Sequence, residues 1–207
     1  MTEPLVAPSG LRARRTAPDA PRGGVLLVPD HVEAEPGEVD AAVARLVAAG
    51  FVVVVPDLGW RGGECPSDPD AIADLRAARD LLPPGRRFVV GLGQGGLYAR
   101  LAACAVLGLA GAVSFGGRVS YPGVSAQRPM QPLDLLPGLG CPLQCHFDEA
   151  DDDTPAGHVD ELERRLSGTS QPWQVFRYPL PARRGDTART AWGRVSSFLL
   201  HLAAAGA

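Results

Sequence analysis

The chain alternates short apolar runs with segments of helical character, and this alternation constrains its fold more than any other feature. The apolar runs are unbroken, as in Phe51–Val55, where a Phe is followed by four Val residues. Such runs are typical of strands that are buried on both faces of a parallel sheet. We therefore predict a doubly wound, mostly parallel α/β sheet flanked by helices.

The predicted strands share an apolar centre and are Val25–Pro29, Phe51–Val55, Phe88–Val90, Gly111–Phe115, Pro142–His146 and Trp173–Tyr178. The predicted helices are Glu38–Ala49, Asp68–Leu82, Gly95–Leu107, Ala156–Leu166 and Thr187–Leu202. Leu11–Thr16 is expected to form an antiparallel edge strand, and residues 1–10 are expected to be a disordered tail. No change in composition marks a second domain, so we expect one domain over residues 1–207.

The turn Gly91–Gly96 follows the strand-like Phe88–Val90 and opens a helical segment. This is the setting of a nucleophile elbow, which reads Gly-x-nucleophile-x-Gly. The nucleophile position falls on Gly93, which has no side chain to attack a carbonyl. Glycine would also relieve the strain of the bend, so Gly93→Ser is expected to lower stability by roughly 1 kcal/mol.

The same turn spells Gly-x-Gly-x-x-Gly, the fingerprint of dinucleotide-binding sites. That fingerprint belongs after the first parallel strand, with an acidic residue about 20 positions further on. Here it follows the third parallel strand, and no Asp or Glu occurs between Gly96 and Leu133. Both facts argue against a nucleotide cofactor, and no cofactor is expected.

In open α/β sheets the ligand crevice lies beyond the carboxyl ends of the strands. Candidate ligand-binding residues at these ends are Asp30, His31, Gln94, Arg183 and Arg184. The amide of Gln94, at a helix N-terminus, and an amide near Asp30 or His31 could form an oxyanion-type nest. His146 also ends a strand, although a buried, hydrogen-bonded histidine is the simpler interpretation.

The bulk composition excludes several classes of protein. A net charge of −3 gives no electrostatic basis for binding nucleic acid or an anionic membrane. The apolar runs are too short to span a bilayer, and no signal peptide is evident, so a cytoplasmic protein is expected. The spacing of the four cysteines suits neither a redox pair nor a zinc site, so all are expected to be free. The acidic run Asp148–Asp153 lacks the pattern of a calcium loop, and no metal is expected.

Three pieces of the chain carry a resemblance to a known family. They are Ala49–Leu58, with its five-residue apolar run followed by Pro-Asp-Leu; Gly111–Gly117, which reads Gly-Ala-Val-Ser-Phe-Gly-Gly; and Tyr178–Pro179 with the later Ala191–Arg194 and Ser197–Leu199. In order and spacing they resemble the dienelactone hydrolase family of α/β-hydrolases, over about residues 11–203. The resemblance implies the α/β-hydrolase fold and an activity on lactones or esters.

Enzymes of this family use a Cys or Ser nucleophile, an Asp and a His, in that order along the chain. The resemblance places the nucleophile on Gly93 and the acid on Asp151, with Asp148 as an alternative match. The base falls on Arg183 or Arg184, and no His lies between His158 and His201. Arginine stays protonated and cannot act as a general base near neutral pH. The resemblance therefore implies a degenerate catalytic triad.

Two functions remain open. The first is a pseudo-enzyme that binds a small anionic ligand through Arg183 or Arg184, or a partner protein; the arginine could instead simply pair with Asp151. The second is an active enzyme, either a hydrolase with relocated residues or a lyase, isomerase or cyclase. Cys65 and Ser67, with His31 across the crevice, are the candidates for a relocated nucleophile. The oligomeric state is not predicted.

Overall fold

The computed structural model describes residues 2–30, 37–60, 62, 65–149, 151, 154–179, 182–183 and 185–205. Within them, eight strands form one sheet in the order β1-β2-β4-β3-β5-β6-β7-β8. Six central and C-terminal strands are parallel: β3 (Gly23–Val28), β4 (Phe51–Pro56), β5 (Arg87–Leu92), β6 (Gly111–Phe115), β7 (Leu143–Asp148) and β8 (Trp173–Tyr178). The predicted mostly parallel α/β sheet is confirmed, and each predicted parallel strand matches one of these six within three residues at either end.

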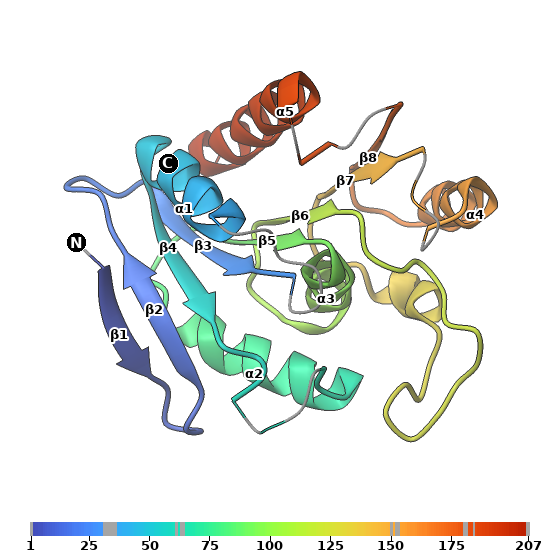
Figure 1. Ribbon diagram of the computed structural model, residues 1–207, viewed down its shortest axis with the longest axis horizontal. Helices are drawn as coiled ribbons and strands as arrows, with labels where there is room; N and C mark the ends of the chain where they lie inside the picture. The colour runs from blue at the N-terminus through green and yellow to red at the C-terminus, as the bar shows by residue number, and fades with distance from the viewer. Residues whose placement is uncertain are drawn as a thin grey trace.

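Helices cover both faces of the sheet (Figure 1). Helices α1 (Glu38–Ala48) and α5 (Gly185–Ala204) pack on one face, and their buried side chains share a core with Phe51 and Phe88. Helices α2 (Asp68–Asp80), α3 (Gln94–Ala105) and α4 (Ala156–Leu166) pack on the other face. The central strands β3 and β4 are built almost wholly of apolar residues and glycine because both of their faces are covered.

The N-terminal segment differs from the sequence-based expectation. Residues 2–6 form strand β1 (Thr2–Val6), which pairs antiparallel with β2 (Arg12–Thr16). The predicted antiparallel strand is therefore present as β2, but β1 and not β2 forms the edge of the sheet. The expectation of a disordered tail over residues 1–10 was wrong for this part. The sequence signal for strand β1 was weak because this strand is almost wholly exposed and contains Pro4, so it lacks the apolar alternation of a half-buried strand.

The long segment between β6 and β7 is mostly irregular, as predicted, and contains one 3-10 helix, η1 (Pro132–Gly138). It is tied to the N-terminus of α2. The hydroxyl of Tyr121 donates to both oxygens of Asp68, at 2.9 and 3.0 Å, and Arg128 forms an ion pair with the same carboxylate at 3.3 Å. Burial raises the pKa of Asp68, against the opposing effects of Tyr121 and Arg128. The loop thus closes over a buried carboxylate.

The four cysteines are free, as expected. Burial raises the pKa of Cys104 and of Cys141 to about 12, which keeps both as unreactive thiols at neutral pH. Among the described residues, no helix has the length and apolar character needed to cross a bilayer.

Candidate functional site

Four neighbouring parallel strands end at the same edge of the sheet and bring their following residues together. Asp30 follows β3, Gly93 follows β5, Gly116 follows β6, and Asp148 ends β7. The backbone N–H of Gly93 donates to the carbonyl of Phe115 at 2.8 Å, which fixes the bend against β6. This is the edge at which open α/β sheets carry their ligand sites.

The bend between β5 and α3 is as sharp as the sequence predicted. Strand β5 ends at Leu92, α3 begins at Gln94, and Gly93 alone joins them with φ 54° and ψ −122°. A positive φ is costly for any residue with a side chain. A Cβ atom added to Gly93 would also overlap Oδ2 of Asp30 and lie only 2.6 Å from its Cγ. The Asp30 carboxylate, 6 % exposed, therefore occupies the space into which a side chain at position 93 would project.

The other glycines of the turn are explained by close packing. A Cβ on Gly91 would lie 2.7 Å from the backbone nitrogen of Gly96, and one on Gly95 would lie 2.7 Å from the carbonyl oxygen of Pro29. Both positions thus bring α3 close to β3 and β5. A Cβ on Gly96, the third glycine of the Gly-x-Gly-x-x-Gly pattern, would lie 2.7 Å from the carbonyl oxygens of Phe115 and Gly116, so close packing accounts for the pattern without a bound phosphate.

Arg183 forms an ion pair with the Asp30 carboxylate. Its guanidinium lies 3.7 Å from Oδ2 of Asp30 and 3.2 Å from Oε1 of Glu38, and it also donates a hydrogen bond to Oε2 of Glu38. The three side chains are largely buried, with exposed fractions of 19 % for Arg183, 15 % for Glu38 and 5 % for Asp30. Arg183 forms ion pairs with Asp30 and Glu38, whereas the sequence had suggested Asp151 as the partner of the arginine.

Asp151 and Asp148 have different surroundings. Oδ2 of Asp151 lies 3.8 Å from the position of a Cβ on Gly116, so this carboxylate reaches the end of β6. Oδ1 of Asp148 accepts a hydrogen bond from the backbone N–H of Ala182 at 2.5 Å. Asp148 therefore anchors the segment that follows β8, next to Arg183. The other two candidates, His31 and Arg184, lie outside the described residues.

Gln94 opens helix α3, as expected, and its side chain contacts Tyr98 one turn later. Burial raises the pKa of Tyr98 to about 12, although the hydrogen bond with the Gln94 side chain lowers it in part. Tyr98 is therefore neutral at physiological pH. The side chain of Gln94 is thereby engaged with its own helix, and its backbone amide remains the group that fits the expected nest.

His146 does not face the crevice. It is fully buried, and Nε2 donates to Oε1 of Gln144 at 3.0 Å while Nδ1 accepts from the Tyr178 hydroxyl at 2.8 Å. The amide nitrogen of Gln144 donates to Gln174 at 2.8 Å, so the amide oxygen of Gln144 is the atom that faces His146. Nε2 of His146 must therefore carry the proton of the neutral imidazole. Burial, together with the positive charge of Arg194, lowers the pKa of His146 to about 3. The interpretation as a buried, hydrogen-bonded residue is confirmed.

Ser67 is not a relocated nucleophile. Its hydroxyl caps α2 by accepting from the backbone N–H of Asp70 at 3.2 Å, and it donates to the Asp70 carboxylate at 2.6 Å. Cys65 is partly exposed near Tyr98. Its proposed partner, His31, is outside the described residues. Within the part of the chain that the structure describes, no group of three or more His, Cys, Asp or Glu side chains could hold a metal ion.

Sequence reasoning missed one residue that shapes this edge of the sheet. Arg100 is 4 % exposed, and its guanidinium donates to the Ser114 hydroxyl and to the carbonyls of Gly116, Gly117 and Arg118, the last three at 2.8, 2.8 and 2.9 Å. It therefore fixes the loop after β6. A signal was present, since Arg100 is the one charged residue of helix α3.

Glu38 was also missed as a site residue. It was expected only as the first residue of a helix, and nothing in the sequence links it to Arg183, 145 positions later. An acidic residue in the first turn of a helix is ordinarily explained by the helix dipole.

Comparisons with known proteins agree with this architecture. The structure is similar to a protein assigned as a dienelactone hydrolase from Klebsiella pneumoniae subsp. pneumoniae, with a TM-score of 0.85 and 18 % identity over 97 % of this chain and 98 % of the other. It is also similar to the Pyrococcus furiosus esterase Pf2001, with a TM-score of 0.80 and 14 % identity over 97 % and 90 %. A third similar structure is the sugar hydrolase YeeB from Lactococcus lactis, with a TM-score of 0.79 and 12 % identity over 97 % and 98 %.

These identities establish the α/β-hydrolase fold and no more. No curated protein matches the chain by sequence. The sequence model of the dienelactone hydrolase family, however, matches residues 71–199, more than half of the 207 residues. By this match, the chain belongs to the dienelactone hydrolase family.

Proposed function

We propose that this protein is a non-hydrolytic member of its family, whose crevice binds a ligand or a partner protein without forming an acyl intermediate. The observation that carries the proposal is the position of the Asp30 carboxylate. It fills the space that a nucleophilic side chain would need at the bend, and Gly93 itself offers no hydroxyl or thiol. Covalent catalysis requires such a nucleophile, activated by a neighbouring base.

The position expected for the base supports the same proposal. Arg183 is permanently protonated, and it faces the carboxylates of Asp30 and Glu38. Its two ion pairs hold the carboxylates of Asp30 and Glu38 in place. The arginine cannot take a proton from a nucleophile, because it is already protonated. Asp151 would act in a relay only by orienting an imidazole. The buried His146 uses both of its ring nitrogens within the sheet core.

The charges of the crevice favour a neutral ligand over the small anion suggested by the sequence. Arg183 is already opposed by two carboxylates, those of Asp30 and Glu38. An anion would have to approach this excess of negative charge. A lactone or ester carbonyl, which carries no charge, could still accept a hydrogen bond from the amide of Gln94 at the N-terminus of α3.

The test combines turnover with binding. Purified protein is incubated with nitrophenyl esters and with a five-membered lactone, and its melting temperature is recorded with the same compounds. We expect no saturable hydrolysis above the rate in buffer. We also expect a neutral lactone to raise the melting temperature, and the size of this rise to change in Asp30→Ala. Cys65→Ala serves as the control for the loop thiol. Saturable hydrolysis that survives Cys65→Ala would contradict the proposal.

One observation favours a second candidate, an enzyme that transfers protons. The Asp30 carboxylate stands where the family's nucleophile would stand, and a carboxylate can remove a proton next to a carbonyl without becoming covalently attached. This function predicts that the protein speeds exchange of the α-hydrogens of a lactone with D₂O, as followed by NMR. Asp30→Asn should abolish the exchange. Exchange at the background rate would leave the binding function as the better account.

A further inference from the structure

A cleft between α5 and β8 lies away from the elbow crevice. Its volume is about 510 Å³, which is within the range of small-molecule sites. It is lined by Gln144, Gln174, Phe176, Thr190, Gly193, Arg194, Ser197, Phe198 and His201. The six residues from α5 recur at intervals of three or four, so one stripe of that helix forms a wall. No acidic residue lines the cleft, and its charged member is Arg194.

Arg194 is held in position without an acidic partner among the described residues. Its guanidinium carbon lies 4.2 Å from the ring centre of Phe176, and Nη1 donates to the Tyr178 hydroxyl at 3.0 Å. The described arginines around the rest of the surface are mostly paired, as Arg177 is with Asp160 and Glu163. Arg194 thus keeps a fixed orientation and retains N–H groups that face the cleft. A planar guanidinium fixed in this way suits a carboxylate.

The floor of the cleft is formed by two hydrogen-bonded amides, of the buried Gln144 and the exposed Gln174. Gln144 is 2 % exposed, and its oxygen accepts from His146 while its nitrogen donates to Oε1 of Gln174. These bonds fix the direction of both amides, so the NH₂ group of Gln174 is left to donate towards the cleft. The floor therefore adds a neutral donor to the positive charge of Arg194. Phe198 supplies an apolar surface beside them.

Gly193 is not explained by the fold. It lies inside α5, where glycine is the least favourable residue after proline, and its φ is not positive. A Cβ added there would meet no atom within 4 Å. No close packing within the described chain therefore demands a glycine. Its effect is to keep the wall of the cleft open beside Arg194.

From the fixed cation, the hydrogen-bonded amides and the open glycine, we propose that this cleft binds a small carboxylate that carries an apolar ring. The carboxylate pairs with Arg194, and the ring lies along Phe198. This inference goes beyond the proposed function, because no residue of the elbow crevice lines the cleft. Its failure would leave the account of Gly93 and Asp30 unchanged.

Benzoate is the probe, and backbone amide shifts in two-dimensional NMR are the measurement. We expect saturable shifts at Gly193, Arg194 and Ser197, with a dissociation constant of about 1 mM, as suits a small ligand in an open cleft. Acetate should bind less tightly because it lacks the ring. Benzylamine should cause no shifts because it is positively charged, as Arg194 is.

Two variants test the assignment. Arg194→Gln should weaken binding about tenfold or more. Gly193→Gln should block the cleft while leaving the melting temperature unchanged or raised, since the added side chain meets open space and favours the helix. Shifts that do not saturate, or equal binding by Arg194→Gln, would overturn the proposal.

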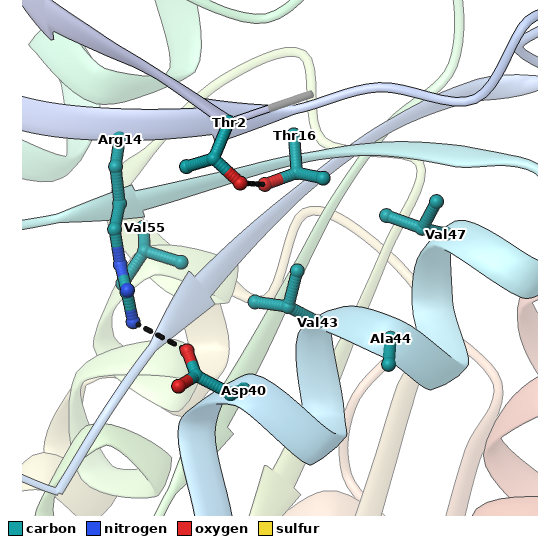
Figure 2. A pocket seen from close by; sticks show the side chains of 8 residues that line it. All are labelled: Thr2, Arg14, Thr16, Asp40, Val43, Ala44, Val47 and Val55. Atoms are coloured by element: carbon teal, nitrogen blue, oxygen red, sulfur yellow. Dashed lines mark hydrogen bonds and ion pairs between the residues drawn. The ribbon is translucent and has the colours of Figure 1, made fainter. Parts of the chain in front are cut away.

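A second cavity supplies a matched control. It lies between α1 and the β1–β2 hairpin, and its arginine, Arg14, already pairs with Asp40 at 3.2 Å (Figure 2). Its walls combine polar side chains with Val43, Val47 and Val55, which are turned towards the space. Because Arg14 has an acidic partner, Arg14→Gln should leave benzoate binding unchanged. A loss of binding in this variant would show that benzoate does not bind in the cleft beside Arg194.

Discussion

The carboxylate of Asp30 occupies the space that a side chain at Gly93 would need. A Cβ on Gly93 would overlap Oδ2 of Asp30, and Arg183 forms an ion pair with the same oxygen at 3.7 Å. The two positions come from different strands, β3 and β5, so the exclusion depends on the register of the sheet. Restoring a nucleophile would therefore require movement of Asp30 as well as a substitution at the bend.

Gly93→Ser should lower the free energy of unfolding by about 2–4 kcal/mol. The positive φ and the overlap with Asp30 both contribute, and each is a source of about 1–3 kcal/mol. This exceeds the roughly 1 kcal/mol expected from backbone strain alone. In an Asp30→Ala background the same substitution should cost about 1–2 kcal/mol less. Urea unfolding of the four proteins measures the difference, and an equal cost in both backgrounds would contradict the overlap.

Arg183→Met should destabilise the protein at neutral pH by about 2–4 kcal/mol, because it leaves the largely buried carboxylates of Asp30 and Glu38 without their cation. Arg183→Lys should cost less, since it keeps the charge. The deficit of Arg183→Met should shrink when Asp30→Asn and Glu38→Gln are added, because these substitutions remove the two charges that the arginine opposes. A deficit that is equal in both backgrounds would show that lost packing, and not charge, is the cause.

His146 should make stability depend on pH. The unfolded residue takes up a proton near pH 6.5, whereas the folded one does so only near 3. Its contribution is therefore present above pH 6.5 and is lost as the pH falls towards 3, at up to about 1.4 kcal/mol for each pH unit. His146→Phe should be less stable at pH 8 but should show a smaller slope between pH 6 and 4. His158→Gln, at an exposed histidine, should keep the original slope.

Asp68→Ala should loosen the loop that precedes η1. It removes the shared partner of Tyr121 and Arg128 and leaves a partly buried guanidinium unpaired, at a cost of about 2–4 kcal/mol. Tyr121→Phe removes hydrogen bonds alone and should cost about 1 kcal/mol. Thermolysin should cleave before the exposed Val124 of this loop faster in Asp68→Ala than in Tyr121→Phe. Equal cleavage rates in both variants and the unmodified protein would mean that Asp68 does not hold the loop.

The strongest periodic signals of the sequence were sufficient to predict the parallel strands of the sheet. Apolar runs located the parallel strands, because burial on both faces favours apolar residues at most positions. The strand β1 was missed for the complementary reason. Its residues are exposed on a hairpin, and its pairing with β2 depends on backbone hydrogen bonds that leave little trace in composition.

The candidate site was predictable only in part. The bend at Gly93 follows from local residue types, and the crevice follows from the sheet topology. The charge arrangement does not, because Glu38 and Arg183 meet across 145 positions and no local pattern encodes that contact. The position of the Asp30 carboxylate over the bend likewise depends on the distance between two neighbouring strands. Such relationships arise from packing.

The most direct test of the central claim is intact-mass spectrometry after exposure to a fluorophosphonate and, separately, to a nitrophenyl ester. Our account predicts that neither reagent leaves a stoichiometric adduct on the native protein, because no hydroxyl or thiol stands at the bend. Cys65→Ala is measured alongside to identify labelling of the partly exposed thiol. A single stoichiometric adduct on a serine or cysteine beside the crevice, lost when that residue is replaced, would contradict the account.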